Sequence, residues 1–161
     1  MYKSQNTWKE IATFLPEKCR IPGESYPSEL YIEWKGNKIH IDHYPNPESD
    51  AKIILLHGVG GNGRLFSFVG EPLFKQGYEV IAPDLPGYGY SEVDKTKVSY
   101  HEWVELTSHL VDVEIAKDER PVFLFGLSAG GMLAIKGPAE NPLRVFSLLH
   151  INNTLVINLS T

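Results

Sequence analysis

The sequence predicts an α/β fold: a mostly parallel sheet of about six strands with helices on both of its faces. Short apolar runs at residues 53–56, 79–82 and 122–125 alternate with segments of helical periodicity at 65–76 and 100–117. This alternation is typical of strands that are joined by crossover helices. Apart from Glu79, the residues of these runs are apolar at consecutive positions rather than at every second one, which indicates strands that are covered on both faces.

Length and composition fit an ordinary globular protein. The chain has 161 residues, of which 42% are hydrophobic and 22% charged, with a net charge of −5. It is long enough to bury a substantial core, and its negative charge argues against nucleic acid or an anionic membrane as a partner. No stretch approaches a membrane span, no apolar signal core opens the chain, and Cys19 is the single cysteine. We therefore expect a cytoplasmic location.

Two regions are expected along the chain. Residues 1–29 are predicted to be an N-terminal helix and loop extension, and residues 30–161 to form the α/β core. The helix is expected at 7–15, with Thr7 as its N-cap, because a glutamate follows three residues later. Prolines and a glycine then predict an extended, looped connection to the core.

The core is expected to open with an antiparallel hairpin. Residues 30–34 and 38–44 read as two strands joined by a tight turn at Gly36-Asn37. In the second strand isoleucines alternate with polar residues, so one face is expected to contact water. His40 and His43 are interpreted as exposed strand residues rather than metal ligands, because nothing with ligand spacing surrounds them. We expect no metal site.

The chain is organised around a strand that ends in G-x-S-x-G. Gly126-Leu127-Ser128-Ala129-Gly130 follows an apolar run and precedes small apolar residues that can begin a helix. In this context the motif predicts a nucleophile elbow, a sharp turn that presents a serine above the sheet. The serine then has a strained backbone, and side chains at the two glycines would collide with the neighbouring strand and helix. We predict that Ser128 is a nucleophile.

A serine that attacks an acyl carbonyl needs two fixed N–H groups that face the developing oxyanion. Ala129 is expected to supply one, because it lies at a helix N-terminus directly after the serine. Val59 is the candidate for the other, in the loop His57-Gly58-Val59-Gly60 that follows a strand. His57 is interpreted as a residue that orders this loop, since the catalytic base must approach the serine from the opposite side.

The same glycines allow a different interpretation. Gly58, Gly60 and Gly63 form G-x-G-x-x-G between a strand and a helix, and Asp84 ends the next strand, where an acid that binds ribose would lie. Three features count against a dinucleotide site. A histidine stands at the strand end, two strands precede the unit, and the strand-turn-helix around Ser128 is left unexplained. We keep dinucleotide binding as the less favoured alternative, and interpret Asp84 as a residue that orders a turn.

Three motifs together carry a family resemblance. They are H-G-x-G at 57–60, D-x-P-G-x-G-x-S at 84–91 and G-x-S-x-G at 126–130. In this order and spacing the chain resembles the α/β-hydrolase family over roughly residues 30–135. Within it, the chain is similar to serine esterases, to lysophospholipase- and monoacylglycerol-lipase-like enzymes and to serine aminopeptidase-like hydrolases.

The resemblance implies a serine hydrolase that cleaves carboxylic esters or related acyl substrates through an acyl-enzyme on Ser128. It implies an oxyanion hole formed by the N–H groups of Val59 and Ala129, a small acyl or lipid-like substrate, and no cofactor. The aspartate of the second motif is usually structural in the family, which agrees with the interpretation of Asp84.

The partners of the serine are the missing part of the resemblance. Family members carry an acid and then a histidine after the nucleophile, and here only Glu140 and His150 follow it in that order. His150 stands within an apolar run, which favours a place in a strand over catalysis. We therefore expect an incomplete α/β-hydrolase fold, truncated after the nucleophile helix and the next strand, and impaired in activity.

Two further expectations follow from an incomplete fold. The chain could be a non-catalytic remnant or an interaction module that keeps the elbow by descent. Its last strand, expected at residues 155–159, should present an exposed edge through which two copies of the chain could associate.

Overall fold

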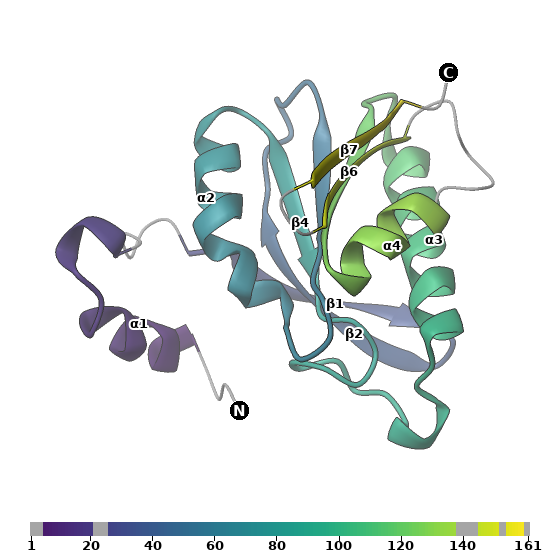
Figure 1. The fold of residues 1–161 in the computed structure, drawn as a ribbon, viewed down its shortest axis with the longest axis horizontal. Helices are drawn as coiled ribbons and strands as arrows, with labels where there is room; N and C mark the ends of the chain where they lie inside the picture. Colours follow the sequence, from purple (N-terminus) through teal and green to yellow (C-terminus); the bar gives the residue numbers. More distant parts are fainter. Residues whose placement is uncertain (1–4, 21–25, 138–144, 152–153, 160–161) are drawn as a thin grey trace.

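The computed structural model describes residues 5–20, 26–137, 145–151 and 154–159, and shows a single sheet with helices on both faces (Figure 1). The strands are β1 (Ser28–Trp34), β2 (Asn37–Tyr44), β3 (Lys52–Leu56), β4 (Glu79–Pro83), β5 (Val122–Leu127), β6 (Val145–Ile151) and β7 (Thr154–Leu159). The α-helices are α1 (Gln5–Thr13), α2 (Ser67–Lys75), α3 (Tyr100–Lys117) and α4 (Ala129–Lys136), and the 3-10 helices are η1 (Glu17–Cys19), η3 (Gly63–Phe66) and η4 (Lys95–Lys97).

The sheet has a parallel centre and antiparallel edges. Its seven strands run in the order β1-β2-β4-β3-β5-β6-β7. β4, β3, β5 and β6 are parallel neighbours, whereas β1, β2 and β7 are added in antiparallel fashion. This arrangement confirms the predicted α/β class and places the carboxyl ends of the central strands at one edge of the sheet.

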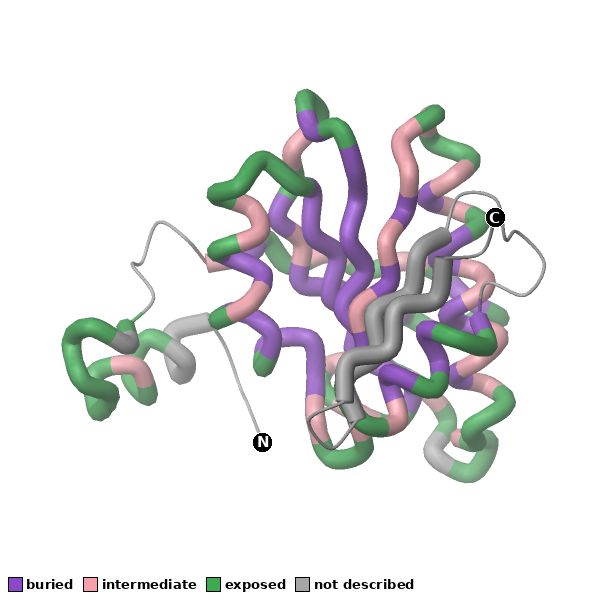
Figure 2. The backbone as a smooth tube through the Cα atoms, turned by 45° about the horizontal axis from the view of Figure 1, so that its top comes forward, coloured by how far each residue is buried: buried purple, intermediate pink, exposed green. Residues whose placement is uncertain are grey.

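Two apolar cores cover the two faces of this sheet. Side chains of α2 pack on one face, against Tyr44, Ile53 and Leu55. The other face is covered by α3 and α4, whose buried side chains meet Ile54 and Leu56. Figure 2 shows the central strands as the most deeply buried part of the chain. Because β3 lies in the middle and is buried along its whole length, it follows the consecutive apolar pattern of the sequence.

The long helix begins and ends where the sequence predicts. Ser99 caps α3, since its Oγ accepts a hydrogen bond from the backbone N–H of Glu102 at 3.2 Å. Trp103 is buried in the first turn and its indole N–H donates to the carbonyl of Pro86 at 3.0 Å. This contact fixes the helix to the loop that follows β4.

The hairpin turn lies one residue earlier than predicted. Trp34 pairs with Asn37, so Lys35 and Gly36 form the two-residue loop in place of Gly36-Asn37. Both have positive φ, +49° and +72°, as a type I′ turn requires. A lysine rarely adopts this conformation, which is why the sequence favoured the glycine-asparagine pair.

The first helix is also displaced toward the N-terminus. α1 begins at Gln5, so Thr7 lies inside the helix and the prediction that it is the N-cap is wrong. Figures 1 and 2 both show α1 set apart from the sheet. Beyond its end, Phe14 is 88% exposed, so the apolar residues here are not held by the core.

The polar face of β2 is buried, contrary to expectation. His40 and Asp42 are each 1% exposed. His40 Nδ1 lies 2.8 Å from a carboxylate oxygen of Asp84, and Arg64 Nε donates to Asp42 at 2.9 Å. His43 is half-buried beside a glutamate of β4. Alternation identifies the residues that share a face, but not the loop and the arginine that later cover it.

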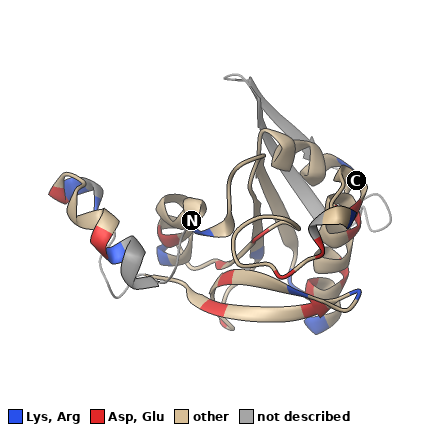
Figure 3. Ribbon diagram, turned by 90° about the horizontal axis from the view of Figure 1, so that it is seen from below, with Lys and Arg blue, Asp and Glu red and all other residues tan. Residues whose placement is uncertain are grey.

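Charges of both signs are interspersed along the described chain (Figure 3). Lys35, for example, bridges Glu102 and Glu105 of α3 at 3.3 and 2.7 Å. No helix in the described part of the chain is both long enough and apolar enough to cross a membrane.

The centre of the sheet should dominate stability. Ile54 is fully buried on β3, so Ile54→Ala removes buried apolar contacts and leaves a cavity. We expect a loss of about 2–5 kcal/mol in the free energy of unfolding, measured in urea. Ile11→Ala, at a position that is 40% exposed on α1, is the matched control and should change it by less than about 0.5 kcal/mol. Equal losses would contradict the assignment of the core to β3.

Candidate active site

Ser128 lies at the sharp turn between β5 and α4. It precedes the first residue of α4, is exposed, and has φ +57° and ψ −121°. For a residue other than glycine this backbone conformation is strained and must be held by its surroundings. The elbow that the sequence predicts is therefore present in the fold, with the serine side chain on the outside of the turn.

Two glycines allow this turn to form. A Cβ at Gly126 would lie on the carbonyl group of Gly130, and a Cβ at Gly130 would lie on the carbonyl of Leu56 in β3. Both contacts are with backbone atoms, which cannot rotate away as a side chain can. The structure thus confirms the predicted reason for glycine at both positions: α4 packs directly on the strands.

The loop after β3 approaches the same serine. A Cβ at Gly58 would lie 3.0 Å from Ser128 Cβ and 3.5 Å from its Oγ, so the two residues are in close contact. The N–H of Gly61 donates to the carbonyl of Gly58 at 3.0 Å, which closes a tight turn. Gly60 stands at the third position of this turn with φ +80°, a conformation that favours glycine.

His57 fixes the start of this loop. Its Nε2 accepts a hydrogen bond from the N–H of Leu85 at 2.9 Å, so Nδ1 carries the proton and donates to the carbonyl of Gly58 at 2.7 Å. The ring is buried, and burial lowers its pKa because the charged form would lose its hydration. His57 is therefore a neutral residue that orders the loop, as predicted.

Asp84 fixes the other end of the loop. Its carboxylate accepts hydrogen bonds from the N–H of Gly63 at 2.6 Å and from the N–H of Tyr90 at 2.8 Å, and it contacts His40 at 2.8 Å. A Cβ at Gly89 would collide with this carboxylate. Asp84 thus orders its own turn, as predicted, and ties it to the loop after β3.

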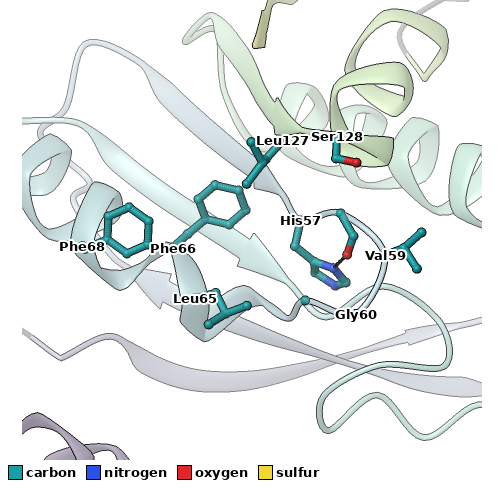
Figure 4. A pocket seen from close by; sticks show the side chains of 10 residues that line it. His57, Val59, Gly60, Leu65, Phe66, Phe68, Leu127 and Ser128 are labelled. Carbon is teal, nitrogen blue, oxygen red and sulfur yellow. Dashed lines mark hydrogen bonds between the residues drawn. The ribbon is translucent and has the colours of Figure 1, made fainter. Parts of the chain in front are cut away.

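An apolar pocket of about 360 Å³ opens beside Ser128 (Figure 4). Phe66 forms its floor with 5% exposure, whereas Phe68 and Leu127 on its wall are 68% and 48% exposed. These aromatic and leucine side chains were not predicted from the sequence as part of the site. Leu127 carried a usable signal, because it is the residue between the glycine and the serine of the motif. The lining residues are His57, Gly58, Val59, Gly60, Gly61, Leu65, Phe66, Phe68, Leu127 and Ser128.

The expected partners of the serine are not brought to it in the described part of the chain. There, no imidazole or carboxylate is hydrogen-bonded to Ser128, and His57 uses both of its nitrogens elsewhere. Glu140 lies outside the described residues. In β6, the backbone of His150 pairs with that of Leu127 in β5. The side chain of His150 lies outside the described part.

The packing of α4 on β3 can be tested with one methyl group. Gly130→Ala should cost about 3 kcal/mol or more in urea unfolding, because its Cβ meets a backbone carbonyl. Gly77→Ala is the control: its surroundings are open and only its φ of +95° is unfavourable, which should cost about 1–2 kcal/mol. If Gly130→Ala were the milder variant, the close contact at the elbow would be wrong.

The buried His57 should make stability depend on pH. Because its pKa is lowered in the fold, the unfolded chain binds more protons below the ordinary histidine pKa, and stability should fall as the pH is lowered from about 7 to 5. The pKa of His40 is raised, since Asp84 outweighs the effect of burial, so His40 contributes with the opposite sign. The contribution of His57 is the difference between wild type and His57→Gln in the slope of the unfolding free energy against pH.

The control for this measurement is His101→Gln, because the side chain of His101 is 80% exposed. That variant should keep the slope of the wild type. A slope in His57→Gln equal to that of the wild type would contradict the neutral, buried state of His57.

Comparisons with known proteins agree with this geometry. A monoglyceride lipase of Rattus norvegicus is 30% identical over 116 residues, which are 71% of this chain and 38% of the lipase. A haloalkane dehalogenase of Psychrobacter cryohalolentis is 31% identical over 118 residues, with the same two shares. The thioesterase domain from the curacin biosynthetic pathway superimposes with a TM-score of 0.64 and 30% identity, over 74% of this chain and 41% of that domain.

The chain therefore spans about 38–41% of the length of these proteins, and their names describe different reactions. The sequence model of the alpha/beta hydrolase fold matches residues 52–160, from β3 to the end of β7. That match covers more than half of the chain and includes both the elbow and the loop that meets it. The chain belongs to the α/β-hydrolase fold family.

Proposed function

We propose that this chain carries the nucleophile and the oxyanion-binding part of a serine hydrolase site that cleaves carboxylic esters or related acyl substrates. The observation that carries the proposal is the exposed Ser128 at a strained turn, in contact with the loop after β3 and at the edge of an apolar pocket. Strain of this kind persists only where the surrounding structure holds it, and it gathers at functional sites.

In the proposed reaction Ser128 Oγ attacks the substrate carbonyl carbon. A new C–O bond forms, the hydroxyl proton passes to a base, and negative charge develops on the carbonyl oxygen. Ala129 supports the proposed oxyanion hole, because the first N–H groups of a helix have no partner within it. When the intermediate collapses, the bond to the leaving oxygen breaks, that oxygen takes the proton from the base, and the alcohol departs. Water then attacks the acyl-enzyme, which releases the carboxylic acid and restores the Ser128 hydroxyl.

The geometry of one peptide group supports Val59 as the second donor. The carbonyl of Gly58 points to His57 and to the N–H of Gly61, with which it is hydrogen-bonded. Because a trans peptide is planar, the N–H of Val59 points in the opposite direction, away from the buried His57. The fixed His57 thus orients this donor without touching the substrate.

The lining of the pocket indicates which chemical group of the substrate would lie beside Ser128. Its apolar lining comes from Leu65, Phe66, Phe68 and Leu127, and no charged side chain among the described residues lines it. An apolar acyl or lipid-like group fits such a lining, whereas a charged group would lose its hydration there without a partner. Lipase and thioesterase relatives agree with acyl chemistry, but the activity and the substrates of the whole protein stay proposals.

A non-catalytic role is the alternative, and one observation favours it. In the described part of the chain Ser128 has no base, so its hydroxyl is a poor nucleophile. We propose that this chain by itself is impaired, by about 10⁴-fold or more relative to an enzyme with a complete triad. A dinucleotide site is less favoured, because the carboxylate of Asp84 is already bonded to Gly63, Tyr90 and His40.

We also propose that copies of the chain associate through β7. β7 is the last strand in the sheet order, and an edge strand can pair with a strand from another chain. Sedimentation equilibrium should detect this association as a mass that rises with concentration, and a constant monomer mass would contradict it. The single cysteine of the sequence supports our expectation of a reducing compartment such as the cytoplasm.

A fluorophosphonate probe tests the proposed nucleophile. We expect the purified chain to be labelled at Ser128 slowly but to completion, and Ser128→Ala to abolish the labelling. Ser28→Ala, at an exposed position at the start of β1, is the matched control and should label as the wild type does. Intact-protein mass spectrometry measures the adduct. Folded protein that takes up no probe would favour the non-catalytic alternative.

A further inference from the structure

A second, smaller cavity is lined by Asp84 and shares no lining residue with the pocket beside Ser128 among the described residues. Counted as the space open to the centre of a water molecule, it measures about 10 Å³, which is close to the smallest volume that holds one water. His40, Arg64, Asp84 and Tyr90 are among the residues that line it. Its volume is too small for any organic ligand, and most of the residues that line it have polar side chains.

Three of the residues that line this cavity each have a polar side-chain atom without a partner among the described residues. These atoms are His40 Nε2, Arg64 Nη1 and the hydroxyl oxygen of Tyr90, and each is buried. His40 itself is 1% exposed. An unsatisfied buried polar group costs free energy, so three of them around one cavity indicate that something small and polar joins them.

From this convergence we propose that the cavity binds one water molecule, held by His40 Nε2, Arg64 Nη1 and the Tyr90 hydroxyl. Asp84 accepts only, so His40 Nδ1 donates to it and Nε2 is the ring nitrogen that is left for the water. The water bonds to this nitrogen and to the Tyr90 hydroxyl, and it accepts from Arg64. Buried waters typically make about three such bonds.

A cation is the competing occupant, and the neighbouring charges argue against it. Glu29, His40 and Asp42 bring three potential ligand atoms within 4.8 Å of one another. Both carboxylates, however, are already bonded to Arg64, which reaches Asp42 at 2.5 and 2.9 Å and Glu29 at 2.6 Å. A metal ion would have to displace the guanidinium or lie beside its positive charge.

The water would add a further link between three parts of the fold. His40 belongs to β2, Tyr90 to the loop after β4, and Arg64 to η3. η3 also carries Leu65 and Phe66, which line the pocket beside Ser128. The bound water therefore supports that pocket from behind. This inference does not depend on the proposed hydrolase activity, because it concerns a site that no substrate reaches.

Two tyrosines provide a matched pair for the test. The rings of Tyr31 and Tyr90 both meet the ring of His40 edge-on at a centroid distance of 5.2 Å, but only the Tyr90 hydroxyl is buried and unpartnered. Tyr90→Phe should remove one partner of the water and lower the melting temperature by about 2–4 °C. Tyr31→Phe should leave the melting temperature unchanged within about 1 °C, since it keeps all three partners.

A crystal structure of the whole chain, at a resolution that shows ordered water, decides the occupant. We expect one peak within hydrogen-bonding distance of all three atoms, weakened or lost in Tyr90→Phe. An empty cavity would overturn the proposal. So would a rise in melting temperature on adding Zn²⁺ together with an anomalous peak in the cavity, which would indicate a metal site. If Tyr90→Phe does not fold, the peak in the wild-type structure still decides between these outcomes.

Discussion

The close packing of backbone on backbone at the elbow is the constraint on which the rest of the site depends. Gly126 and Gly130 bring the first turn of α4 against β5 and β3 so closely that not even a methyl group fits between them. This packing forces the residue between strand and helix into a positive φ. Ser128 is thereby presented at the exposed side of the turn, above the sheet.

A second layer of order comes from two buried side chains, His57 and Asp84. His57 and Asp84 fix the two ends of the loop after β3, each through hydrogen bonds to backbone N–H or C=O groups. Because these partners lie in separate segments, the loop has little freedom except at its tip. Preorganised N–H groups of this kind are effective at stabilising charge, since they need not reorient during a reaction.

The sequence predicted those parts of the fold that rest on local rules. The G-x-S-x-G elbow, the helix at residues 100–117 and the roles of His57 and Asp84 follow from spacing and turn chemistry, and the structure bears them out. The N–H groups of Val59 and Ala129 stay predictions, because a donor is identified only with its acceptor present.

What the sequence could not predict depends on residues far apart in the chain. The burial of His40 requires the loop after β4, more than 40 residues later, and Asp42 is covered by Arg64, which no local pattern connects to it. The turn at Lys35-Gly36 was missed for a different reason. Its lysine adopts a conformation that single-residue preferences disfavour, and the register of the flanking strands overrides that preference.

The loop after β3 is held by hydrogen bonds to later segments of the chain, and this affects how the chain folds during synthesis. The hydrogen-bond partner of His57 Nε2 is Leu85, 28 residues downstream, and the partner of the Gly63 N–H is Asp84, 21 residues downstream. A nascent chain that has emerged from the ribosome only as far as β3 therefore lacks both of these hydrogen bonds. During synthesis these hydrogen bonds can form only after Asp84 and Leu85 have emerged, and Ser128 can meet the loop only after β5 has followed.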